Sequence, residues 1–151
     1  MKERGRSHSF LLREGSWEAK GEYRDRNDIM LPFDGRTEIL HTADLWLNRG
    51  NLRVGGDPVH QFGITREVVP LADGAEHTTW VSHNPHLGIL RGNLAVTPDY
   101  ILSLFTSADG HYCGTEYLFR IDDGVYRCRG ILFAAKERFS SWSAELRRGT
   151  L

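Results

Sequence analysis

The chain has no long hydrophobic run and almost no net charge. The apolar run nearest its N-terminus, Phe10-Leu11-Leu12, is too short for a signal-peptide core or a transmembrane helix. Its 19 basic and 20 acidic residues leave a net charge of −1, which provides no electrostatic footprint for nucleic acid or an anionic membrane. We therefore expect a cytoplasmic protein that binds neither nucleic acid nor membrane.

Motifs for catalysis and metal binding are also missing. There is no Gly-x-Ser-x-Gly, no phosphate-binding glycine loop and no His-Glu-x-x-His. His83 and His86 form a His-x-x-His, but no carboxylate or thiolate follows at a ligand spacing, so a solvated loop is the better interpretation. The sequence thus predicts no metal site, names no cofactor and leaves open whether the protein is an enzyme.

Turn signals, by contrast, are frequent. Asp-Gly, a dipeptide suited to two-residue hairpin turns, occurs at 34-35, 73-74, 109-110 and 123-124. Closely spaced breakers with no sustained helical period predict an all-β fold, a ten-stranded antiparallel up-and-down barrel in which closure removes exposed edges. We expect residues 1–9 as a flexible basic tail, a short helical turn near residues 9–14, and a single barrel domain over residues 10–151. The expected strands are 15–25, 36–47, 51–54, 60–71, 76–82, 87–96, 100–107, 111–121, 125–134 and 138–148.

Strand periodicity and hairpin register predict which side chains face the interior. Between Arg13 and Asp25 an aromatic and small set alternates with charged residues, so Trp17 and Tyr23 share one face. A two-residue loop at 123-124 would place Phe119 opposite Cys128 and make this the apolar face of its hairpin, with Glu116 and Arg120 outside unless the hairpin is flipped. The predicted ligand-binding residues are Trp17, Tyr23, His41, Tyr100, Leu102, Leu104, Tyr117, Phe119 and Tyr126.

Two of these predictions have structural alternatives. Trp17 could equally be a core plug that touches no ligand. His41 shares the apolar parity of its strand, and a core histidine with its hydrogen bonds satisfied is the more frequent outcome at such a position.

The two cysteines are predicted to be buried, unpaired thiols. The same register puts Cys113 and Cys128 on one face but roughly 20 Å apart along the strands, at 3.3 Å per residue. No disulfide spans that distance. We expect both thiols to be slow to react in the native protein.

Short motifs at both ends resemble calycin barrels, a group that includes lipocalins, fatty-acid-binding proteins and nitrobindin-like proteins. The opening Gly15-Ser16-Trp17 is similar to the Gly-x-Trp of their first strand, and the segments 117–120, 126–129 and 144–148 are similar to the closing strands of the nitrobindin-like group. The resemblance implies a ten-stranded barrel around an apolar or haem ligand. At the position of the haem-ligating histidine this chain has Ser141, a poor ligand for haem iron.

Three functions follow from this reading. The first is a protein that holds a small apolar or amphipathic molecule inside its barrel. The second is a barrel enzyme, a lyase or isomerase acting on a small organic acid. The third is a filled barrel acting through a surface patch around Ile131 and Phe133. A haem-binding protein without the usual histidine ligand, and a homodimer, also stay open.

Overall fold

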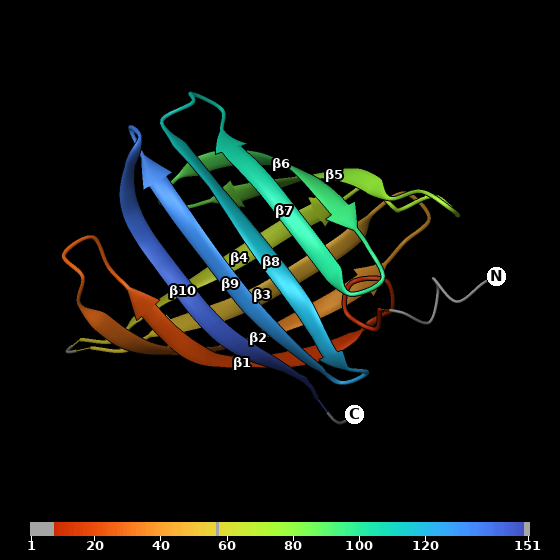
Figure 1. The fold of residues 1–151 in the computed structure, drawn as a ribbon, viewed down its shortest axis with the longest axis horizontal. Coiled ribbons are helices and arrows are strands. Elements are labelled where there is room, and N and C mark those ends of the chain that lie inside the picture. Colours follow the sequence, from red (N-terminus) through yellow and green to blue (C-terminus); the bar gives the residue numbers. More distant parts are fainter. Residues whose placement is uncertain (1–7, 57, 150–151) are drawn as a thin grey trace.

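The computed structural model describes residues 8–56 and 58–149, and it is all-β. Ten antiparallel strands form a closed barrel in which each strand pairs with its neighbours in the sequence and β1 pairs with β10 (Figure 1). The predicted fold class is confirmed. The strands are β1 (Gly15–Arg24), β2 (Met30–His41), β3 (Trp46–Val54), β4 (His60–Val68), β5 (His77–Asn84), β6 (Gly88–Val96), β7 (Tyr100–Ser107), β8 (Tyr112–Asp122), β9 (Val125–Ala134) and β10 (Glu137–Arg148).

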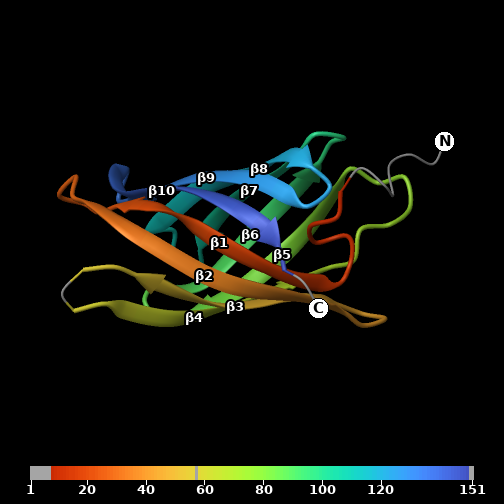
Figure 2. The ribbon, with the colours of Figure 1, turned by 90° about the horizontal axis from the view of Figure 1, so that it is seen from below.

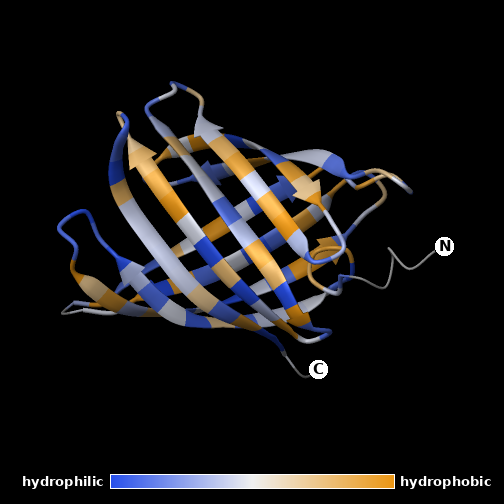
Figure 3. Ribbon diagram, viewed as in Figure 1, coloured by the Kyte–Doolittle hydropathy of each residue, from blue (hydrophilic) through white to orange (hydrophobic). Residues whose placement is uncertain are grey.

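Alternation of hydropathy along the strands is the local cause of the barrel (Figure 3). In β6, Leu90, Gly92, Leu94 and Val96 are buried, while the alternate residues Arg91, Asn93 and Ala95 are more exposed. Each strand can therefore turn one face to the interior and one to water. Closure pairs the last strand with the first, as at Tyr23 with Trp142, so that neither is left as an edge.

The N-terminal segment closes one end of the barrel. Residues 10–12 form a turn and not the predicted helical turn, and Phe10 and Leu11 are 4% and 3% exposed. Phe10 packs edge-on against Trp17, with ring centroids 5.3 Å apart. We call this end, which lies at the right in Figure 1, the closed end.

Residues 8 and 9 belong to this plug and not to the predicted tail. His8 is fully buried and shares its two ring nitrogens between the Tyr126 hydroxyl, 2.8 Å away, and the Thr97 carbonyl oxygen, 2.6 Å away. Ser9 donates to the carbonyl oxygen of Asp123. The rest of the predicted tail lies outside the described residues.

The second predicted strand is wrong because Asp34-Gly35 is not a turn. It lies inside β2, where Arg53 of β3 donates to Asp34 over 3.0 and 3.2 Å on the outer face. A Cβ at position 35 would overlap the side chain of Leu52, so glycine permits close packing there without any change of direction. The break expected between the strands 36–47 and 51–54 likewise lies inside β3.

A bulge next to the Asp123-Gly124 turn overturns the predicted register of β8. Asp122 faces Val125 as a two-residue loop requires, but the pairing shifts after this point, so Cys128 faces Leu118 and not Phe119. One extra residue reverses which side chains point inward along a whole strand. Glu116 and Arg120 therefore have the inward parity, and Tyr117 and Phe119 the outward one.

The wall of the barrel is weakest between β4 and β5. These strands pair only at Arg66 with Ser82, Glu67 with Val81 and Val68 with Trp80, whereas β4 pairs with β3 along its whole length. Figure 2 shows β3 and β4 continuing past β5 towards the left end. We call this short pairing the β4–β5 seam.

Candidate functional site

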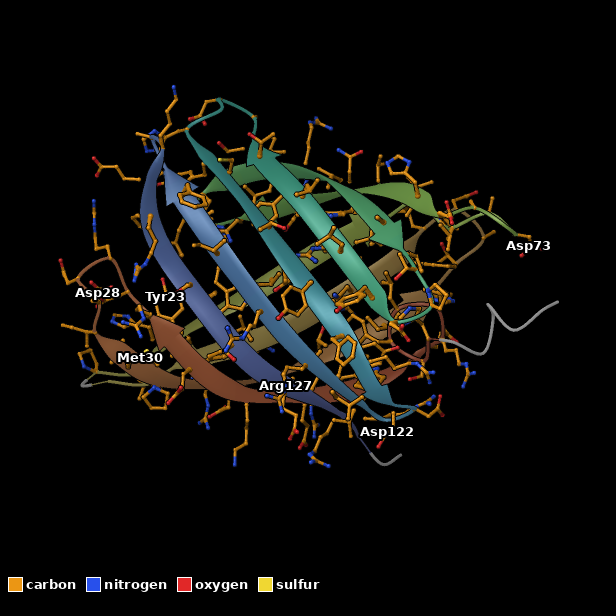
Figure 4. The ribbon with its side chains drawn as sticks, viewed as in Figure 1. Tyr23, Asp28, Met30, Asp73, Asp122 and Arg127 are labelled. Atoms are coloured by element: carbon orange, nitrogen blue, oxygen red, sulfur yellow. The ribbon has the colours of Figure 1, made fainter. Side chains whose placement is uncertain are left out.

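The interior of the barrel has a filled half and a half that solvent reaches. Near the closed end the inward side chains of Trp17, Ile39 and Val68 are at most 1% exposed. Towards the other end several inward side chains are only half-buried, among them Tyr23, Phe33, Phe62, Phe105 and Trp142, although Val54 and Leu132 are buried there. Tyr23, Asp28 and Met30 mark this open end in Figure 4, and Asp73 and Asp122 mark the closed end.

An ion pair lies inside the barrel wall where the two halves meet. Arg66 of β4 has the inward parity of the buried Val68, and its Nη1 is 3.7 Å from Oε1 of Glu116 on β8. The two side chains are 22% and 17% exposed, so solvent reaches an inward-facing pair. The bulge in β8 is what turns Glu116 inward.

Three further side chains hold this pair in place. Trp142 donates from its indole nitrogen to Oε2 of Glu116 over 2.8 Å, and the Cys128 thiol lies 3.4 Å from the same oxygen. The guanidinium of Arg66 lies over the ring of Trp80, 4.0 Å from its centroid, which is a cation–π contact. We call Arg66, Trp80, Glu116, Cys128 and Trp142 the interior cluster.

Two glycines keep the tryptophans of this cluster against the barrel wall. Gly92 pairs with Trp80 and Gly130 pairs with Trp142, and a Cβ at either glycine would overlap the facing indole. Each indole thus covers its cross-strand glycine, an arrangement known to support strands that contain glycine. The tryptophans are held flat, which positions their N–H groups and leaves the middle of the barrel to other side chains.

The buried position of Cys128 and the neighbouring Glu116 carboxylate make its thiol a weaker acid. Burial, the charge of Glu116 and the hydrogen bond to it raise the pKa of Cys128 well above its ordinary value. Cys128 is therefore a neutral thiol at neutral pH. Cys113 is exposed on the outer face, so the prediction that both cysteines are buried is wrong for Cys113. The two thiols lie on opposite faces, and both are free.

The predicted ligand-binding residues divide between the interior, the closed end and the outer surface. Trp17 and Tyr126 are at most 1% exposed and belong to the packing around the plug, and Tyr23 faces inward at the open end. His41 stacks on Trp46 and bonds the Leu11 carbonyl oxygen at 2.8 Å, so it ties the plug to β2.

The other five predicted residues point outward, so their predicted inward orientation is wrong. Tyr100, Leu102 and Leu104 alternate with the buried Ile101 and Ser103, and they are 43%, 38% and 55% exposed. The bulge in β8 had no sequence signal, and an error at this hairpin carries back through the next one. The outer stripe, as we call this apolar surface on β7 and β8, consists of Tyr100, Leu102, Leu104, Tyr117 and Phe119.

A groove of about 430 Å³ lies beside the outer stripe, across β8, β9, β10 and β1. The small residues Ser141 and Ser143 share its lining with the larger Tyr117, Arg129 and Arg24. Ser141, the position that matches the haem ligand of the nitrobindin-like group, has the parity opposite to the inward Trp142 and so faces this groove and not the interior.

Within residues 8–56 and 58–149, no three His, Cys, Asp or Glu side chains gather as metal ligands would. His86 packs edge-on against Phe62, with ring centroids 6.0 Å apart. No helix in these ranges has the length and hydropathy needed to cross a bilayer.

Searches of known families and of curated proteins find no sequence match to this chain. Among solved structures, the S-type phycobiliprotein lyase CPES from Guillardia theta is similar over 91% of this chain and 88% of its own, with a TM-score of 0.65 and 10% identity. A candidate AttH protein from Nitrosomonas europaea matches 88% of this chain and 49% of its own at 12% identity, but its TM-score is only 0.33. The first likeness covers most of both chains and, at 10% identity, shows the fold alone.

Proposed function

We propose that this protein binds a small, largely apolar molecule in the open half of its barrel. The observation that carries the proposal is the half-buried state of inward aromatic side chains, including Phe62 and Phe105, beside a filled and plugged half. Ligand sites in proteins are mostly apolar concavities with a few polar groups, and the interior cluster supplies such groups. The fold of a phycobiliprotein lyase is consistent with a barrel that holds an organic molecule.

The β4–β5 seam supports this proposal. Ligand sites of β-barrels lie in their mouths. Here the β4–β5 seam adds a stretch of wall with few hydrogen bonds beside the open half of the interior. Arg66 lies where the two strands part, so a molecule that enters there meets the interior cluster directly.

The first test uses N-phenyl-1-naphthylamine, a neutral apolar probe whose fluorescence rises in a dry environment. We expect saturable binding with energy transfer from Trp80 and Trp142. Ile64→Trp adds bulk on an inward position of β4 and is expected to weaken binding at least tenfold. The matched control, Leu104→Trp, adds the same side chain on the outer stripe and is expected to leave the affinity unchanged.

Two results would reject the proposal. One is the absence of saturable probe binding to a folded protein. The other is binding that Leu104→Trp weakens and Ile64→Trp does not, because that pattern assigns the probe to the outer surface. Thermal melting of both variants identifies any loss that comes from unfolding.

A second candidate function, a lyase or isomerase acting on a small organic acid, is favoured by one observation. Glu116 is a carboxylate inside the barrel, within reach of solvent and of the Arg66 guanidinium. A positioned carboxylate in a pocket can act as a general acid or base. If so, Glu116→Gln is expected to keep ligand binding and abolish conversion, measured as the mass of recovered ligand. Conversion at the original rate in this variant would reject that role.

A further inference from the structure

We infer that the ligand carries a carboxylate and that Arg66 binds it. This inference rests on the proposed function, since it identifies the chemical class of the molecule held in the open half. It is carried by the incomplete hydrogen bonding of Arg66, by the anchoring of Glu116 to other donors, and by the position of Arg66 at the β4–β5 seam.

The guanidinium of Arg66 has unmet hydrogen-bonding capacity. Its Nε is buried and has no hydrogen-bond partner. Its nearest carboxylate oxygen, Oε1 of Glu116, is 3.7 Å from Nη1, beyond the usual 2.7–3.2 Å of an N–H···O hydrogen bond. A guanidinium presents five N–H donors in a fixed plane, so this one is held mainly by its contact with the face of Trp80.

Glu116 is anchored by donors other than Arg66, and its Oε1 stays 3.7 Å from the guanidinium. Its Oε2 already accepts from the Trp142 indole at 2.8 Å, and it faces the Cys128 thiol at 3.4 Å. The Gly130 and Trp142 pairing fixes that indole, so the carboxylate is anchored on the β9–β10 side of the barrel. The pair is thus separated by its supports, and Arg66 keeps donors for another acceptor.

The partner that fits a planar, forked donor beside apolar walls is a carboxylate attached to an apolar body. An arginine binds a carboxylate through two parallel N–H···O bonds, which gives both strength and orientation. The 22% exposure of the Arg66 side chain provides contact with the open half, and the fork turns onto the incoming acid. The apolar part of the ligand then lies among the half-buried inward residues Phe33, Phe62 and Phe105. Glu116 has the same charge as the ligand and opposes its binding. Removal of the Glu116 charge should therefore strengthen binding of the acid, whereas removal of Arg66 should weaken it.

The test compares two probes that differ only in charge: 11-(dansylamino)undecanoic acid and its primary amide. For the full chain we expect the acid to bind about ten to a hundred times more tightly than the amide, as hydrogen bonds to a charged group predict. Arg66→Gln is expected to remove this preference while the amide binds as before. Glu116→Gln is expected to increase the preference. Arg91→Gln, a substitution of an exposed arginine on the outer face of β6, is the matched control and is expected to change nothing.

The outcomes separate the two proposals. If neither probe binds the folded protein, the proposed function fails. If both bind equally, or if Arg66→Gln keeps the preference for the acid, the barrel binds apolar molecules but the carboxylate assignment is overturned. Arg66→Lys provides a second variant in case Arg66→Gln does not fold: it keeps the charge without the fork, and we expect it to retain only part of the preference.

Discussion

Replacing Gly130 by alanine tests whether the cross-strand glycines position the interior cluster. The new methyl group would overlap the indole of Trp142, which must move away from the wall and from Oε2 of Glu116. Overpacking a closely packed site costs about 1–3 kcal/mol. Loss of a hydrogen bond to a charged group costs about 1.5–3 kcal/mol.

The net change in stability follows from these two costs and one gain. Alanine is better than glycine inside a strand by roughly 0.5–1 kcal/mol, which offsets part of the loss. We therefore expect Gly130→Ala to lower the free energy of unfolding by roughly 2–5 kcal/mol. This is a large share of the 5–15 kcal/mol typical of a domain. Urea denaturation followed by tryptophan fluorescence gives the measurement.

A double-mutant cycle identifies the cause. In a Trp142→Leu background the indole and its hydrogen bond are already gone, so Gly130→Ala is expected to cost less than about 1 kcal/mol. An equal cost in both backgrounds would show that the glycine acts on the backbone of β9, and the argument that glycines hold the indoles in place would be refuted.

Four further predictions concern the thiols, the plug, one hairpin and the outer stripe. Ellman's reagent is expected to modify Cys113 rapidly and Cys128 only on unfolding; two fast thiols would contradict the burial of Cys128. Burial lowers the pKa of His8 below 6.5, so the folded protein favours the neutral imidazole. The stability that this gives is complete above pH 6.5 and is lost as the pH falls through the folded-state pKa. His8→Gln should reduce this pH dependence in thermal melts between about pH 7.5 and 5. Ala135 and Lys136 both have positive φ in the β9–β10 turn, so Ala135→Asn with Lys136→Gly is expected to raise the free energy of unfolding by roughly 1–2 kcal/mol, and a loss of stability would contradict the turn geometry. Leu102→Ser is expected to leave probe binding unchanged, and weakened binding would contradict the outward orientation of Leu102.

The sequence predicted the number of strands well because strands and turns depend on local signals, and it predicted closure because a long meander otherwise leaves two exposed edges. Alternation in residues 15–24 and turn chemistry at Gly110, with φ at 78°, are encoded within a few residues. Asp34-Gly35 shows the limit of such signals, since its role is decided by Leu52 and Arg53 on the neighbouring strand. The turn at Ala135 and Lys136 is the opposite case: the chain reverses there although neither residue type is typical of a turn.

The candidate site was harder to predict because orientation inside a barrel depends on register. A single bulge near Asp122 turns Glu116 towards the interior and turns Tyr117 and Phe119 outward, the reverse of the predicted orientation. The flipped hairpin that would bring Glu116 and Arg120 inside was recognised as an alternative, but nothing in the sequence favoured it. Arg66 had no sequence signal at all, since its inward position follows from the parity of β4 in the folded barrel.

The β4–β5 seam has a consequence for how the molecule exchanges its contents. Fluctuations that part a sheet begin where the fewest hydrogen bonds must break, and in this ring that place is the seam of three residue pairs. Amide protons of Arg66, Glu67 and Val68 should therefore exchange with solvent through local opening, at rates unrelated to global unfolding. Ligand release through the same opening would be equally independent of overall stability. A substitution that strengthens the closed end would then raise the melting temperature without lengthening the time for which a ligand stays bound.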